Sequence, residues 1–254
     1  MNIKEVFRGI GFNLQILYNL KHIFKGKISF GEFIFLFCQD MSYFARLFRY
    51  KLIGVDIARG RYAREAIKMN SQNSGYMETR AFMVKGLLKN FSITPEDKIF
   101  DYGSGKGFAL ILFSKYPFGE IGGVELVKEL HDAAVKNFSR LKLNHVKSYN
   151  EDATKFEKID QFNYFYVYNP FMKQIFEAVI QQIANSLSRN PRKIIFIYNR
   201  PVEKDFLINS GLFPYYKEIP FVSLYKSKFV QKLAFKRYKN RSVVIFSNEP
   251  LDML

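Results

Sequence analysis

Residues Asp101–Gly107 read DYGSGKG and join an apolar segment that predicts a strand to an apolar segment that predicts a helix. Doubly wound α/β sheets bind nucleotide-like ligands at such a turn. Glycines let the backbone turn tightly and approach a ligand closely, because no Cβ is in the way. The carboxylate of Asp101 would repel a pyrophosphate and attract a cation. The stretch therefore predicts a site for a nucleotide-like ligand that carries positive charge.

Two other glycine motifs fit this stretch less well. In the dinucleotide fingerprint G-x-G-x-x-G the third glycine would stand one residue later than it does here. A P-loop, G-x-x-x-x-G-K-[ST], needs a hydroxyl after its lysine, and here Gly107 follows Lys106. A nicotinamide-dependent oxidoreductase is therefore the weakest of the functional alternatives.

Glu125 ends IGGVE, a short apolar segment that predicts the second strand, and lies 24 residues after Asp101. A carboxylate at the tip of the second strand of a βαβ unit accepts hydrogen bonds from ribose hydroxyls. We therefore assign Glu125 to the ribose. The alternative is a surface glutamate at a strand end.

The first βαβ unit resembles that of class I S-adenosylmethionine-dependent methyltransferases, through FDYGSGKGFALILFSKYPFGEIGGVELVKELHDAAVKN. The resemblance covers about residues 74–200. Together GSGKG, GVE and YNPF are similar to small bacterial methyltransferases and, more distantly, to lysine methyltransferases of the disruptor-of-telomeric-silencing type. The resemblance implies an α/β, Rossmann-like, seven-stranded and mostly parallel sheet with helices on both faces. It also implies S-adenosylmethionine as cofactor, bound by the glycine turn through Asp101, Gly103, Ser104, Gly105 and Gly107.

Three further cofactor contacts follow from the resemblance. An acid after the third strand accepts a hydrogen bond from the adenine amino group in these enzymes, which points to Asp152, with Glu151 beside it. The alternative is an acidic helix start, which the helix dipole favours. Tyr76 and Thr79 precede the first strand, where a segment often folds over the cofactor. They are candidate contacts to the methionine tail, or ordinary capping residues.

Tyr168-Asn169-Pro170-Phe171 ends the predicted fourth strand, where the methyl group meets its acceptor in this superfamily. An asparagine carbonyl can accept hydrogen bonds from an amine and aim its lone pair at the sulfonium. Pro170 rigidifies the turn, and Phe171 can cover the acceptor. Asn169, Pro170 and Phe171 are therefore the catalytic candidates, the alternative being an ordinary strand-to-helix turn. A single proline precedes Phe171, so the motif departs from the Asn-Pro-Pro-Tyr type and base methylation is in doubt.

No general base is evident, because the three histidines fall away from the predicted strand tips. A neutral amine needs only in-line placement, so the missing base does not argue against methyl transfer to nitrogen. Our first hypothesis is a nitrogen acceptor, with a protein lysine favoured. One cysteine and three scattered histidines form no metal-ligand spacing. A single cysteine, Cys38, also suits a reducing compartment, and no signal peptide is evident. We therefore expect a cytoplasmic bacterial protein, or one peripheral to the inner face of the membrane.

The net charge of +16 is uneven: +7 over residues 1–75, +2 over 76–190 and +7 over 191–254. We predict a basic helical extension over 1–73, followed by a cofactor-binding domain over 74–254 with a basic insertion at about 224–241. Basic flanks favour an anionic partner such as RNA or a membrane surface. An amino-acid composition typical of AT-rich genomes explains them equally well. A nucleic-acid- or membrane-binding protein that keeps the fold is the alternative function.

Helical spacing predicts an amphipathic helix over 3–24 and a second one begun by a capping box of Ser29 and Glu32. The second carries an aromatic stripe that packs into the core or, with the basic residues that follow, lies on a membrane. Alternating elements then predict helices over 108–116, 128–141, 172–188 and 202–209, and strands over 121–125, 145–149, 162–168, 193–199, 213–222 and 242–247.

Overall fold

A computed structural model describes residues 28–58, 79–168 and 171–252 of the chain. Tyr76, Asn169, Pro170 and the helix predicted over 3–24 lie outside these residues. The predicted boundary at residue 73 lies outside them too, so the division into two domains stays a prediction.

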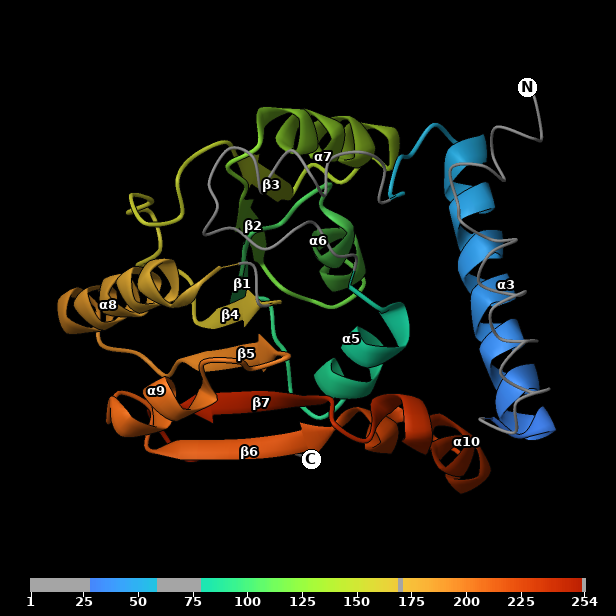
Figure 1. The fold of residues 1–254 in the computed structure, drawn as a ribbon. Coiled ribbons are helices and arrows are strands. Elements are labelled where there is room, and N and C mark those ends of the chain that lie inside the picture. The colour runs from blue at the N-terminus through green and yellow to red at the C-terminus, as the bar shows by residue number, and fades with distance from the viewer. Residues whose placement is uncertain (1–27, 59–78, 169–170, 253–254) are drawn as a thin grey trace.

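Seven strands form one sheet in the order β3-β2-β1-β4-β5-β7-β6, which confirms the predicted architecture (Figure 1). The strands β1 to β5 are parallel to one another, and β7 runs antiparallel to both β5 and β6. The carboxyl ends of β1 to β5 therefore meet at one edge of the sheet. The strands are β1 (Lys98–Tyr102), β2 (Glu120–Val124), β3 (Val146–Tyr149), β4 (Tyr164–Val167), β5 (Ile195–Asn199), β6 (Tyr215–Pro220) and β7 (Ser242–Ser247).

Helices cover both faces of the sheet, and each face has its own hydrophobic core. One core takes side chains from α3 (Phe30–Leu52), α5 (Ala81–Leu88), α6 (Phe108–Phe113), α7 (Lys128–Arg140) and α10 (Lys228–Tyr238). The other takes them from α8 (Lys173–Arg189) and α9 (Lys204–Asn209). The four helices predicted after residue 107 are present with shifted ends. The largest of these shifts is at α6, which stops at Phe113, where the Ser114 hydroxyl donates to the carbonyl of Ile111.

The helix α3 begins with the predicted capping box, in which Ser29 and Glu32 each accept a hydrogen bond from the other's backbone N–H. The prediction that its aromatic stripe is core is wrong for five positions, Phe30, Ile34, Phe37, Met41 and Phe48, which are exposed. The reason is that α3 packs on α10 and on the Tyr225 ring through another side, which carries the buried residues Phe35, Leu36 and Leu47. Among the described residues, no helix is long and apolar enough to cross a membrane.

The basic segment 226–241 forms α10 and follows a short 3-10 helix, η1 (Phe221–Leu224), so that it lies between β6 and β7. The Ser227 side chain caps α10 by accepting a hydrogen bond from the N–H of Val230. Tyr238 is fully buried, whereas Phe229 and Phe235 are exposed. The insertion is thus packed into the protein through the Tyr238 side chain, whereas Phe229 and Phe235 lie on the surface.

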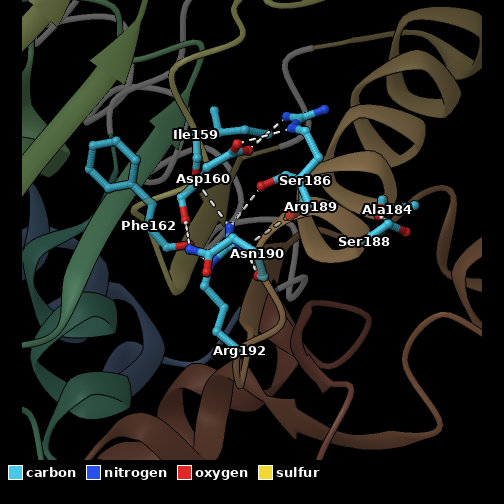
Figure 2. A network of polar contacts seen from close by, with 9 residues as sticks. All are labelled: Ile159, Asp160, Phe162, Ala184, Ser186, Ser188, Arg189, Asn190 and Arg192. Carbon is cyan, nitrogen blue, oxygen red and sulfur yellow. Dashed lines mark hydrogen bonds and ion pairs between the residues drawn. The ribbon is translucent and has the colours of Figure 1, made fainter.

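A polar network closes the edge of the sheet opposite the glycine turn (Figure 2). Arg192, which precedes β5, holds together the segment before β4 and the end of α8. Arg189 at the end of α8 forms a two-pronged ion pair with Asp160. Because these groups lie at the amino ends of β4 and β5, they serve the fold and not the candidate site. The guanidinium of Arg192 donates to the carbonyls of Ile159, Phe162, Ser186 and Asn190 and to the hydroxyl of Ser186.

Candidate functional site

The glycine turn leaves β1 and enters α6 with three glycines in the left-handed region. The φ angles are 77° at Gly103, 56° at Gly105 and 75° at Gly107, so other residues would be strained there. A Cβ on Gly107 would also lie 2.4 Å from the ring of Phe138. The backbone N–H groups of Gly103 and Ser104 donate to the carbonyl of Val124, which ties the turn to the end of β2.

Asp101 is the second-to-last residue of β1 and is only 4% exposed. In the described part of the chain no group donates a hydrogen bond to its carboxylate. Burial, and then the neighbouring carboxylate of Glu125, raise the pKa of Asp101 well above its usual range. A buried carboxylate without a donor is costly, and a cationic ligand would offset that cost. Asp101 lies where the sequence predicted it, at the base of the turn.

Glu125 directly follows β2 and holds the glycine turn as well as the next loop. Its Oε2 accepts from the N–H of Gly105 at 2.8 Å, and its Oε1 accepts from the N–H of Val127 at 2.9 Å. Burial raises the pKa of Glu125, and these backbone hydrogen bonds oppose the rise. Each carboxylate oxygen has a second lone pair, so both can still accept a ligand hydroxyl. The ribose assignment stays a prediction that this geometry allows.

Asp152 follows β3 at the same edge of the sheet and is half-buried. Its Oδ1 accepts hydrogen bonds from both the N–H and the hydroxyl of Thr154, which closes a local turn. Asn150, two residues earlier, donates to the carbonyls of Glu125 and Leu126. The ends of β2 and β3 are thereby joined, and the assignment of Asp152 to adenine stays a prediction.

Thr79 is buried, and its hydroxyl lies 3.2 Å from that of Tyr166, a β4 residue in register with Asp101. Asn199, the last residue of β5, donates its side-chain N–H to the same tyrosine hydroxyl at 2.9 Å. Sequence reasoning missed Tyr166 and Asn199, because neither residue stands in a motif. The contact to Tyr166 ties Thr79 to the sheet, and its proposed role at the methionine tail is untested.

The side-chain oxygen of Asn199 is buried and has no hydrogen-bond partner among the described residues. Phe171, on the far side of the undescribed pair 169–170, is half-buried and packs against the core beneath α8 and α9. The predicted catalytic role of Asn169, Pro170 and Phe171 therefore rests on the sequence. What the structure adds is a second amide, Asn199, one strand along from the end of β4.

Lys106 lies inside the glycine turn, and its ammonium group is held by the segment before residue 59. Its Nζ donates to a carboxylate oxygen of Asp56 at 2.6 Å and to the carbonyl of Ala58 at 2.8 Å. The buried side-chain N–H of Asn137 donates to the carbonyls of Asp56 and Lys106. Sequence reasoning missed this role, because Asp56 and Ala58 lie 50 and 48 residues before Lys106 in the chain. The contacts fasten the segment before residue 59 to the turn.

The histidines of the described residues lie away from the carboxyl ends of β1 and β4. His131 Nδ1 is 2.8 Å from the hydroxyl of Ser148, and burial lowers the pKa of His131. His145 precedes β3 at the opposite edge of the sheet. Within the described ranges no group of three or more histidines, cysteines and acids could hold a metal ion.

Comparisons with solved structures give several methyltransferases of low identity. One is geranyl diphosphate C-methyltransferase from Streptomyces coelicolor A3(2), at 13% identity, with 65% of this chain and 77% of that chain covered and a TM-score of 0.46. Another is the 23S rRNA methyltransferase ErmE, at 12% identity, 71% and 72% coverage and a TM-score of 0.44. A search of curated proteins finds no match.

A family model matches residues 53–186, more than half of the chain: that of protein-L-isoaspartate(D-aspartate) O-methyltransferase. The match spans the glycine turn, both buried acids and the end of β4. The turn suits S-adenosylmethionine, because the donorless carboxylate of Asp101 suits its positive charge and Glu125 keeps lone pairs for its ribose. The chain therefore belongs to the protein-L-isoaspartate(D-aspartate) O-methyltransferase family, and it is an S-adenosylmethionine-dependent class I methyltransferase.

Proposed function

We propose that this enzyme transfers the methyl group of S-adenosylmethionine to a nitrogen nucleophile, with a protein lysine as the favoured acceptor. The observation that carries the proposal is the buried side-chain oxygen of Asn199, which lacks a donor among the described residues. An unpaired buried acceptor costs about 1–3 kcal/mol. An amine acceptor would supply the missing N–H, and the sequence places a second asparagine, Asn169, directly after the end of β4.

In this proposal the residues of the chain bind and orient. Bound S-adenosylmethionine supplies an electrophilic methyl group on a positively charged sulfur. Asp101 and Glu125 fix the donor at the ends of β1 and β2, and the side-chain oxygen of Asn199 holds the amine at the end of β5. In-line placement of a neutral amine is itself a large rate factor, so the proposal needs no general base.

The test is methylation of a host lysate with S-adenosylmethionine labelled in its methyl group, followed by fractionation and alkaline treatment. Methyl amines survive alkali, whereas methyl esters release methanol. Alkali-stable label in protein hydrolysates, recovered as methyl-lysine, is the expected result. Gly103→Arg, which blocks the turn, is the control and should abolish both cofactor binding and labelling. Label found only in RNA, lipid or alkali-labile form would contradict the proposal.

A second candidate acceptor is a carboxylate oxygen, and the family match favours it because the family is named for O-methylation. A carboxylate is ionised at neutral pH and, like a neutral amine, needs no base. The alkaline treatment above separates the two candidates in one assay, because label released as methanol indicates an ester.

Binding to an anionic surface is a further candidate, favoured by exposed apolar side chains beside basic ones on α3 and α10. Phe30, Phe37, Phe229 and Phe235 are exposed, and α10 carries lysines between its aromatics. Retention on anionic vesicles or RNA that falls with salt and is lost on neutralising residues 226–241 would support this candidate. Asp101→Ala should leave such retention unchanged.

A further inference from the structure

Three arginine side chains converge on the ring of Tyr238. Their guanidinium carbons lie 5.7 Å (Arg80), 5.9 Å (Arg237) and 5.6 Å (Arg241) from the ring centroid. The ring itself is fully buried, whereas Arg237 is exposed and the other two are partly exposed. Three like charges therefore share a single aromatic neighbour and remain within reach of solvent.

This cluster lies at the edge of the sheet where the carboxyl ends of β1 to β5 meet. Arg241 immediately precedes β7, whose first residue, Ser242, accepts from the N–H of Arg200 at the end of β5. Since β5 and β7 are antiparallel, the start of β7 lies at the carboxyl end of β5. Arg80 follows Thr79, whose hydroxyl contacts Tyr166 of β4. Figure 1 shows α5, which begins after Arg80, and α10, which ends at Tyr238, beside that edge.

The charges near the cluster do not balance. Asp40 on α3 faces Arg237 and Arg80, and burial raises the pKa of Asp40. No ion pair joins Arg80, Arg237 or Arg241 to an acid within the described ranges. Arg241 also faces the guanidiniums of Arg200 and Arg80, together with Tyr168 and Tyr238. A cation–π contact uses the face of a guanidinium and leaves its N–H donors available.

We propose that Arg80, Arg237 and Arg241 form a subsite for an oxyanion, a phosphate or carboxylate, on the methyl acceptor itself. Guanidinium groups bind both oxyanions through paired N–H donors. The β4 end, where the acceptor nucleophile is expected, is two strands from β7. At about 4.8 Å per strand, the oxyanion and the methylated atom are about 10 Å apart. The inference rests on the proposed function only in assigning this oxyanion to the methyl acceptor.

The oxyanion bound by the arginines is not the group that receives the methyl group. A carboxylate paired with guanidiniums is a weaker nucleophile, and the cluster lies beyond β5 from the end of β4. The proposal therefore predicts acceptors with two features, a nucleophile and a separate anionic group. A lysine with an acidic or phosphorylated residue nearby has both.

The first experiment titrates inorganic phosphate, and separately acetate, into the full-length protein at low chloride, read by calorimetry. Arg80→Gln and Arg241→Gln are each expected to weaken phosphate binding about tenfold, because each removes a charge-assisted donor pair. Arg49→Gln, which removes an exposed arginine of α3, is the matched control and should change nothing. Comparing the affinities for phosphate and for acetate shows which oxyanion the subsite prefers.

Arg241→Lys keeps the charge and should retain part of the affinity even where the glutamine variant folds poorly. Equal phosphate affinity in the wild type, Arg80→Gln and Arg241→Gln would overturn the proposal, as would the absence of saturable phosphate binding by the wild type. The affinity for S-adenosylmethionine, measured in the same samples, should not change in any arginine variant. A wild-type protein that does not bind S-adenosylmethionine would instead refute the proposed function. The failure of the subsite and the failure of the proposed function are therefore distinguishable.

Discussion

Asp101→Asn is expected to have opposite effects on the free protein and on its complex with S-adenosylmethionine. The substitution replaces a 4% exposed carboxylate by a neutral amide of nearly the same shape. Because burial and Glu125 raise the folded-state pKa of Asp101 above its unfolded value, its charge destabilises the fold. That penalty is absent below the unfolded pKa of about 4 and grows as the pH rises towards the folded pKa. At neutral pH the ligand-free variant should therefore be more stable than the wild type.

The complex should weaken, because a charge-assisted hydrogen bond to the ligand is lost. Such a bond contributes about 1.5–3 kcal/mol. At 1.4 kcal/mol per factor of ten, the dissociation constant for S-adenosylmethionine should rise about 10- to 150-fold. The two effects are opposite because no described residue donates a hydrogen bond to the carboxylate of Asp101. A carboxylate with such a donor would stabilise the free protein.

The assay is urea denaturation of the ligand-free protein between acidic and neutral pH, with calorimetry for cofactor affinity. Asp132→Asn, which removes an acid on α7 paired with Lys128, is the matched control and should change neither quantity much. A ligand-free Asp101→Asn variant that is less stable at neutral pH and binds S-adenosylmethionine normally would refute the reasoning.

Three further substitutions test the turn and the two edges of the sheet. Gly107→Ala places a Cβ 2.4 Å from the Phe138 ring at a positive φ, so the free energy of unfolding should fall by about 1–3 kcal/mol in urea; unchanged stability would contradict the described turn. Glu125→Gln leaves one acceptor oxygen for two backbone N–H groups, so cofactor affinity measured by calorimetry should fall about tenfold. Arg192→Met removes five hydrogen bonds and should cost about 2–4 kcal/mol in denaturation. The folded Arg192→Met protein should bind S-adenosylmethionine normally, and a large loss would mean that this network reaches the site.

Much of the fold follows from local signals in the sequence. The capping box at Ser29, the glycine turn and the alternation of apolar segments each depend on neighbours within a few residues. The seven-stranded, mostly parallel sheet was expected from a resemblance and is confirmed. The aromatic stripe of α3 was misjudged, because helical spacing shows that a face is apolar but not whether another element covers it.

At the candidate site, the sequence by itself determined which residues lie at a strand end. Asp101 lies within β1, the glycines follow that strand, and Glu125 follows β2, so strand geometry alone brings them together. Only the tertiary structure decided the contacts made by residues far apart in the chain. The salt bridge from Lys106 to Asp56, the pairing of Asn199 with Tyr166, and the convergence of Arg80 with Arg241 on Tyr238 each join separate elements. No local sequence pattern predicts these long-range contacts, because they depend on the strand order of the sheet and on where α10 packs.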